Sequence, residues 1–167
     1  MKQDLVAILN VHGPALHALL LRLTLRQDAA DDLLQELFVK LAGSHGFRAA
    51  TDPAAYVKRT AINLALDWRR ARKRAPAEGD VEGVAPDPPA LDALIDREDV
   101  ERILDASAEL SELSREALVM RYVQQESFDA IGVALGRTPH QARGLCHAAV
   151  VELRKRLAER VTPYERR

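Results

Sequence analysis

Apolar residues recur three and four positions apart through most of the chain, and this pattern predicts helices rather than strands. A first helix is expected over residues 4–25, with an interruption near Gly13 and Pro14. Asp28 is a candidate N-cap for a second helix, whose apolar positions end at Leu41, shortly before two glycines. The amino-terminal half therefore predicts three or four packed helices.

A further helix of this half is expected to begin at Pro53. Asp52 can accept a hydrogen bond from the first turn, and proline suits the first helical position because the N–H that it lacks would have no helical partner there. The apolar face of this helix extends from Tyr56 to Trp68, and the helix runs into a basic stretch, residues 69–74. The pattern therefore predicts an amphipathic helix with a strongly cationic end.

A segment with neither helical nor strand periodicity divides the chain. Residues 75–89 contain four prolines, two glycines and four acidic residues. Proline removes backbone donors and the like charges repel, so a flexible, extended acidic linker is expected. It would separate a domain of residues 1–74 from a domain of residues 90–167, and the fold class predicted is all-α, with two small helical domains.

The second domain is expected to hold helices over residues 90–108, 114–123, 127–135 and 139–160. Gly136, Arg137 and Thr138 join the last two. Gly136 can adopt the left-handed conformation of a helix C-cap, and Thr138 can cap the next helix ahead of Pro139. A short helix, a tight glycine turn and a longer basic helix predict a helix-turn-helix.

The net charge of the chain conceals an uneven distribution of charge along the sequence. The net charge of −1 argues by itself against a nucleic-acid binder. Residues 54–74, however, hold seven Lys or Arg and one Asp, and residues 137–167 hold eight Lys or Arg and three Glu. Residues 75–101 between them hold nine acidic residues and one Arg. Two basic regions separated by an acidic connector favour nucleic-acid binding by both domains.

Composition excludes several classes of protein. The single cysteine, Cys146, allows no internal disulfide, and no apolar run is long enough to span a bilayer or to serve as a signal peptide. Cys146, His140 and His147 lack the spacing of zinc ligands, and no phosphate-binding glycine loop or nucleophile elbow is present. A cytoplasmic protein with no membrane segment, metal, cofactor or enzymatic activity is expected.

Three helix faces carry the candidate functional residues. The second helix of the helix-turn-helix exposes a set that can reach base edges and phosphates, namely His140, Gln141, Arg143, Gly144 and His147. The helix from Pro53 carries a polar ribbon suited to a phosphate backbone, formed by Arg59, Asn63 and Arg70 together with Asp67. The third face combines acidic, amide and apolar side chains, namely Asp32, Leu34, Gln35, Glu36 and Phe38. Taken singly, each pattern also fits an ordinary solvated helix face.

Together and in this order, these features resemble the extracytoplasmic-function group of bacterial sigma factors over residues 12–157. The stretch DAADDLLQELF, residues 28–38, resembles the family's region 2.2, and YVKRTAINLALDWRR, residues 56–70, resembles regions 2.3 and 2.4. Residues 110–122 and 127–136 resemble region 4. The resemblance implies a transcription initiation factor that brings core RNA polymerase to promoter DNA.

The resemblance also implies a role for each face. The side chains that would dock on the clamp helices of the polymerase β′ subunit are Asp32, Leu34, Gln35, Glu36 and Phe38. Those along the DNA at the −10 element would be Arg59, Asn63 and Arg70, with the loop of residues 43–51 receiving a flipped-out base. Those that read the −35 element would be Gln141, Arg143, Gly144 and His147. An anti-sigma protein that clamps the two halves is an implied regulatory partner.

Other functions stay open because this sequence departs from the family pattern. The family usually has arginine where Leu145 and Ala148 stand, so a helical adaptor or decoy that binds polymerase or an anti-sigma partner without promoter recognition is one alternative. A helix-turn-helix regulator that never contacts polymerase is a second, although it would not need the region 2 helices. A small helical enzyme is a third, and it would need a carboxylate cluster in a closed pocket.

Overall fold

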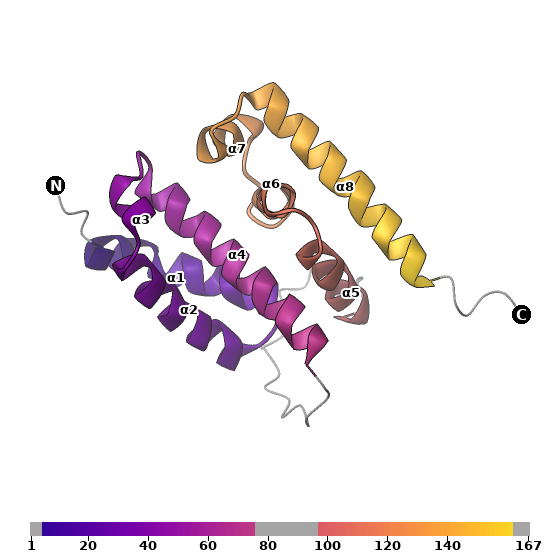
Figure 1. Ribbon diagram of the computed structural model, residues 1–167, viewed down its shortest axis with the longest axis horizontal. Helices are drawn as coiled ribbons and strands as arrows, with labels where there is room; N and C mark the ends of the chain where they lie inside the picture. Colours follow the sequence, from indigo (N-terminus) through magenta and orange to yellow (C-terminus); the bar gives the residue numbers. More distant parts are fainter. Residues whose placement is uncertain (1–4, 76–96, 162–167) are drawn as a thin grey trace, which may run out of the picture. The chain divides into compact units, whose positions relative to one another are not determined.

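The computed structural model describes residues 5–75 and 97–161, and these residues form helices joined by short turns (Figure 1). The two ranges belong to two compact units. The predicted all-α class is therefore confirmed for the described part of the chain. The predicted linker, apart from Ala75, and the first part of the helix predicted from residue 90 lie outside the described residues.

The helices follow the predicted order, with one short helix added. The first unit contains α1 (Leu5–Thr24), α2 (Gln27–Ala42), α3 (His45–Ala49) and α4 (Pro53–Arg74). The second contains α5 (Arg97–Ala108), α6 (Glu112–Tyr122), α7 (Phe128–Leu135) and α8 (Pro139–Val161). Since α3 lies within residues 43–51, the predicted loop there is in part helical.

The first unit is a helical bundle in which α1, α2 and α4 pack on one another (Figure 1). Its core is made of large aliphatic side chains with almost no exposed surface, among them Leu20, Leu23, Leu37, Ile62 and Leu66. Burial of one such side chain contributes about 1.5–3 kcal/mol. The apolar residues that recur with the helical period thus form the inner face of each helix, and most of the polar residues lie on the outer face.

The predicted interruption of the first helix is wrong, because α1 continues through Pro14. Proline lacks the backbone N–H that would bond to the carbonyl four residues earlier, and its ring crowds that carbonyl. Asn10, which provides the carbonyl, and Pro14 are both exposed. Water can therefore satisfy this carbonyl, and the helix is not forced to break.

By length and composition alone, α1 would also be able to cross a membrane, a test that core helices of soluble proteins pass as well. Its carboxyl-terminal half, however, is buried against α2 and α4 through Leu16, Leu19, Leu20 and Leu23. The carboxyl-terminal half of α1 therefore contributes to the core of the bundle, whereas Val6 and Val11 in its amino-terminal half are exposed.

The start of α2 also differs from the prediction. The N-cap position is Arg26, which provides no side-chain cap, and Asp28 lies inside the first turn. The Arg26 guanidinium donates to both carboxylate oxygens of Asp28, from Nε at 3.1 Å and from Nη2 at 2.8 Å. These hydrogen bonds lower the pKa of Asp28. Asp28 therefore stabilises the helix start as a negative charge near the positive end of the helix dipole rather than as a cap.

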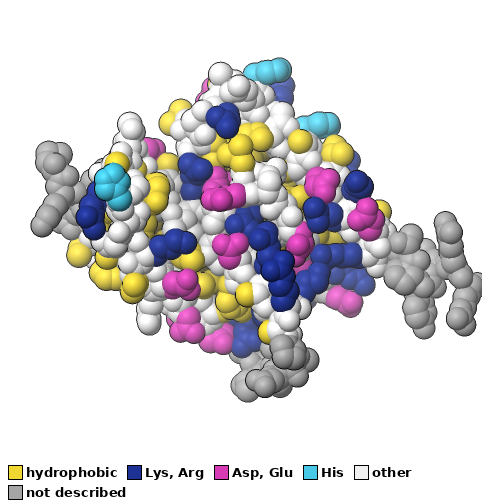
Figure 2. Space-filling model, in the orientation of Figure 1, with side chains coloured by type: hydrophobic (Ala, Val, Ile, Leu, Met, Phe, Trp, Pro, Cys, Tyr) yellow, Lys and Arg dark blue, Asp and Glu magenta, His cyan; other side chains and the backbone are white. Residues whose placement is uncertain are grey.

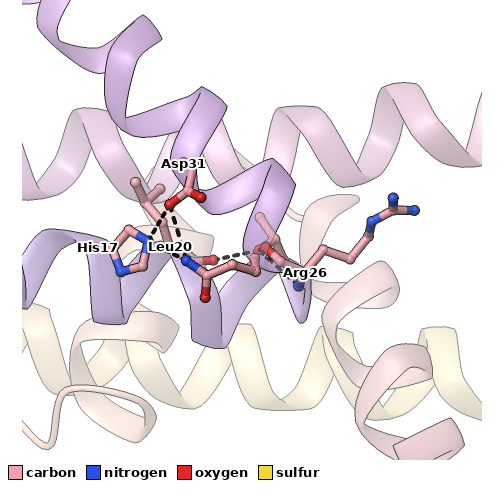
Figure 3. A network of polar contacts seen from close by, with 6 residues as sticks. His17, Leu20, Arg26 and Asp31 are labelled. Atoms are coloured by element: carbon pink, nitrogen blue, oxygen red, sulfur yellow. Dashed lines mark hydrogen bonds and ion pairs between the residues drawn. The ribbon is translucent and has the colours of Figure 1, made fainter. Parts of the chain in front are cut away.

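A polar network ties α1 to α2 (Figure 3). The Nε2 atom of His17 lies 2.7 Å from Oδ1 of Asp31, and the side-chain amide of Gln27 donates to the same oxygen at 3.1 Å. At the end of α1, the Thr24 hydroxyl donates to the Leu20 carbonyl at 2.8 Å. The His17–Asp31 contact joins the two helices and helps to fix the orientation of α2, the helix that carries one of the candidate surfaces.

In the second unit, α8 packs against α5, α6 and α7. The residues of α8 predicted to face the core are buried at Ala142, Cys146 and Ala149 and half-buried at Leu145 and Leu153. Burial raises the pKa of the Cys146 thiol, whose sulfur donates to the Ala117 carbonyl at 3.5 Å. Cys146 is therefore a protonated core residue.

Candidate functional site

The first candidate surface lies on the solvent-facing side of α2. We call it the α2 surface, and it consists of Asp32, Leu34, Gln35, Glu36 and Phe38. Asp32, Gln35 and Glu36 are exposed, Leu34 is half-buried, and Phe38 keeps 42% of its surface exposed. An apolar centre with a polar rim is typical of a protein–protein interface. The alternation of buried and exposed positions along α2 is what the sequence predicted.

The second surface, which we call the α4 ribbon, consists of Arg59, Asn63 and Arg70. All three side chains are half-buried. Beyond them, Arg72 lies with its Cζ atom 5.5 Å from the centroid of the Trp68 ring. Lys and Arg side chains gather over the carboxyl-terminal part of α4 (Figure 2). This end of α4 is therefore a concentrated source of positive charge.

One arginine of the same basic run has a structural role that sequence reasoning missed. Arg69 is only 2% exposed, and its Nη1 donates to the Thr24 carbonyl at 3.3 Å. Carbonyls at the end of a helix lack helical partners and carry a partial negative charge. Arg69 therefore satisfies the carboxyl end of α1 instead of adding to the exposed charge of α4. The one available signal was its spacing, since position 69 follows the buried Leu66 by three residues and the buried Ala65 by four.

The segment predicted to capture a base is held against α4. Ser44 caps α3 by accepting from the Phe47 N–H at 3.0 Å, and its hydroxyl lies 3.1 Å from that of Tyr56 on α4. Phe47 is 2% exposed, and its ring centroid is 6.3 Å from that of Tyr56. An added Cβ at Gly46 would lie 2.7 Å from the Tyr56 hydroxyl oxygen. Residues 43–51 thus form an anchored segment with little room at its contact with Tyr56.

The third surface, which we call the α8 surface, consists of His140, Gln141, Arg143, Gly144 and His147, and all five residues are exposed as predicted. The turn before it has the predicted chemistry. Gly136 is a left-handed C-cap with φ 63°, and the Thr138 hydroxyl accepts from the Gln141 N–H at 3.2 Å. Arg143 lies with its Cζ atom 5.1 Å from the centroid of the Phe128 ring.

Gln141 is predicted to read a base, but in the structure its side chain contacts the backbone of Thr138. Its Oε1 atom accepts from the Thr138 N–H at 2.9 Å, while its own N–H donates back to Thr138. This reciprocal pair is a capping box, and it satisfies two donors at the start of α8. Gln141 therefore stabilises the recognition helix, and the predicted bidentate contact with adenine would require its Oε1 atom to leave the cap.

A second residue missed by sequence reasoning is Gly132, inside α7. An added Cβ would lie 2.7 Å from the Arg137 carbonyl oxygen and 3.2 Å from the Thr138 carbonyl carbon. Only a residue without a Cβ lets α7 approach the turn so closely. The one available signal was a glycine inside a predicted helix, four residues before the glycine of the turn.

The described residues hold no group of three or more His, Cys, Asp or Glu side chains able to bind a metal ion. What they do hold is a helix face with an exposed aromatic residue, a cationic helix end, and a helix-turn-helix with a polar outer face. These features can bind a protein surface and nucleic acid.

Comparisons with known proteins agree with this description. The Sigma-70 region 2 family matches residues 8–75. The RNA polymerase sigma factor CarQ of Myxococcus xanthus is 30% identical over 149 residues, which cover 89% of this chain and 86% of CarQ. An RNA polymerase sigma-E factor of Streptomyces antibioticus is 30% identical over 134 residues, covering 78% of this chain and 72% of that protein.

A solved structure of the sigma factor RpoE in complex with the anti-sigma factor NepR, from Bartonella quintana, is also similar to this chain. It has 22% sequence identity and a TM-score of 0.49, and the match covers 90% of this chain and 94% of that one.

The chain belongs to the RNA polymerase sigma factors, in the extracytoplasmic-function group. As a sigma factor, it binds core RNA polymerase and directs it to promoter DNA for transcription initiation. Sigma factors are initiation factors rather than enzymes, so the expected class of function, binding without catalysis, agrees with the family.

Proposed function

We propose that this sigma factor docks on the β′ clamp helices of core RNA polymerase through the α2 surface. In the same proposal the α4 ribbon binds and helps to melt the −10 element, and the α8 surface binds the −35 element. One observation carries the proposal: the residues that the family resemblance assigns to partners are exposed or half-buried, while their neighbours at core positions are buried. Initiation takes place where the bacterial DNA is, and we therefore assign the protein to the cytoplasm.

The charge and position of the α4 ribbon support contact with the phosphates of the melted strand. Each neutralised phosphate of a single strand changes the slope of log affinity against log salt concentration by about 0.7. Asn63 lies between the two arginines on the same ribbon and adds a side-chain amide, which can hydrogen-bond the Watson–Crick edge of an unstacked base.

Replacing Arg59 and Arg70 together by alanine is expected to weaken binding of the holoenzyme to a single-stranded −10 oligonucleotide. The salt slope should become shallower by about 1.4, since two phosphate contacts are lost. Fluorescence anisotropy over a range of salt concentrations measures both quantities. The matched control, Arg22→Ala with Arg160→Ala, removes the same charge from exposed positions elsewhere. Equal slopes for the two double variants would contradict the assignment.

Gly144 provides a test of the α8 surface that separates stability from binding. An added Cβ at Gly144 meets nothing within 4 Å, so Gly144→Ala should stabilise the free protein by about 0.5–1 kcal/mol through the higher helix propensity of alanine. Binding of the holoenzyme to the upstream promoter duplex should weaken, because the methyl group would meet the DNA backbone. Thermal denaturation and anisotropy measure the two effects. A variant that is more stable and binds equally well would show that DNA does not approach Gly144.

A second candidate function is an adaptor or decoy that binds polymerase or an anti-sigma protein without reading promoters. It is favoured by one observation, the presence of Leu145 and Ala148 where the family usually has arginine. Leu145 is half-buried and Ala148 is exposed, so α8 offers fewer cations to DNA than the family pattern would. Regulation by an anti-sigma partner that covers the α2 surface or the α8 surface belongs to either function.

A further inference from the structure

An aromatic ring at the start of α7 lies against two arginines from two other helices. The Cζ atom of Arg121, on α6, is 4.4 Å from the centroid of the Phe128 ring, and the Cζ atom of Arg143, on α8, is 5.1 Å from it. A guanidinium at such a distance from an aromatic face is attracted by the ring quadrupole. Phe128 thus touches the one cation of the α8 surface.

Arg121 is held from a second direction as well. Its Nη1 atom donates to the Glu126 carbonyl at 2.9 Å, in the turn that precedes α7. This carbonyl fixes the Arg121 guanidinium against the ring, and Arg121 in turn helps to hold the Phe128 ring in place. A DNA phosphate is a suitable partner for an ordered guanidinium, because a hydrogen bond between two charged groups is stronger than one between neutral groups.

We propose that Phe128 is a positioning residue that orders Arg143 for contact with a phosphate of the upstream promoter duplex. An arginine side chain that is already ordered loses less conformational entropy when it binds. Removal of the ring would leave the charge of Arg143 in place but not its orientation. The inference rests on the proposed DNA contact of Arg143.

A purely structural role for Phe128 gives a different expectation. Phe128 is half-buried and is the first residue of α7, so its loss would also disturb packing. Packing alone would weaken DNA binding whether or not Arg143 is present. Positioning requires that the effect of the ring disappear once Arg143 is gone. A double-mutant cycle separates the two roles.

The cycle uses the holoenzyme and a fluorescent duplex that carries the upstream half of a promoter mapped by run-off transcription. Arg143→Ala should weaken binding about tenfold, as expected for a well-placed arginine contact. Phe128→Leu should weaken it about two- to fivefold, the value of one cation–π contact. The double variant should bind no more weakly than Arg143→Ala alone. Losses that multiply in the double variant would overturn the inference.

Two further variants test whether the effect comes from the aromatic ring itself. Phe128→Tyr keeps the ring and should bind within about twofold of the unchanged protein, since the quadrupole is retained. A loss as large as that of Phe128→Leu would contradict positioning by the ring. If Phe128→Leu does not fold, as judged by circular dichroism, Phe128→Met takes its place in the cycle, because methionine fills a similar volume without an aromatic face.

The control for net charge is Arg154→Ala, which removes an exposed arginine from the same helix. If Arg143→Ala binds no more weakly than Arg154→Ala, the proposed DNA contact of Arg143 fails, and the inference fails with it. If Arg143→Ala binds much more weakly but its effect is independent of Phe128, the DNA contact stands and only the positioning role is overturned.

Discussion

Replacing Gln35 and Phe38 together by alanine is expected to remove most of the binding to core RNA polymerase, with a loss of affinity of about a hundredfold or more, without unfolding the chain. Both side chains are exposed on the outward half of α2, so neither contributes to the core of the bundle. A central aromatic residue at an interface typically contributes 2 kcal/mol or more, roughly a thirtyfold change in affinity, and loss of the adjacent amide adds to it. Affinity measured by fluorescence anisotropy with labelled sigma factor should fall by about a hundredfold or more on this basis.

The matched control is Asn10→Ala with Val11→Ala. It also removes an exposed amide and an exposed apolar side chain from a helix of the same unit, but one that carries no assigned partner. Both double variants should give the circular dichroism spectrum of the unchanged protein. Polymerase binding that survives in the Gln35 and Phe38 variant, with a native spectrum, would show that the α2 surface is not the polymerase interface.

Replacing Gly132 by alanine is expected to destabilise the second unit by about 1–3 kcal/mol, the usual cost of overpacking. The added Cβ would lie 2.7 Å from a backbone carbonyl oxygen of the turn, and a backbone atom there cannot move without opening the helix-turn-helix. The melting temperature of this unit should fall by roughly 5–20 °C, as such a change implies for a domain of this size. Binding to the upstream promoter duplex should weaken with it.

The sequence provides an internal control for this measurement. Trp68, the single tryptophan, lies in the first unit, so its fluorescence follows that unit while circular dichroism follows both. The Gly132→Ala transition should move to lower temperature in circular dichroism and stay in place in tryptophan fluorescence. Gly144→Ala, in the same unit, should shift the circular dichroism transition the opposite way. A Gly132→Ala protein as stable as the unchanged one would contradict the close approach of α7 to the turn.

Features that depend on a few neighbouring residues were predictable from the sequence. The cap at Asp52 with Pro53, the cap at Thr138 with Pro139, and the left-handed Gly136 all follow from local backbone geometry and side-chain chemistry. The inner faces of α2 and α8 were predictable because burial repeats with the period of the helix. The exposure of the candidate surfaces follows from the same period.

Features set by contacts between distant residues, or by competition between neighbouring side chains, were not predictable. Arg69 stands in a run of arginines, and only the packing of α4 on α1 brings it to the Thr24 carbonyl. The two arginines at Phe128 come from α6 and α8, so their proximity depends on how three helices pack. Asp28 was predicted to cap α2 because its residue type suits an N-cap, but Arg26 binds its carboxylate instead. In each case the residue type allows several roles. Which of them the side chain takes depends on the neighbours that folding brings to it.

The most direct test is transcription from fragmented genomic DNA by core RNA polymerase mixed with the purified protein, followed by sequencing of the run-off transcripts. We expect discrete start sites that share sequence elements near −10 and −35, absent when core polymerase is used alone. The Gln35 and Phe38 double variant should remove them. Polymerase binding with no specific start sites would contradict promoter recognition by this protein.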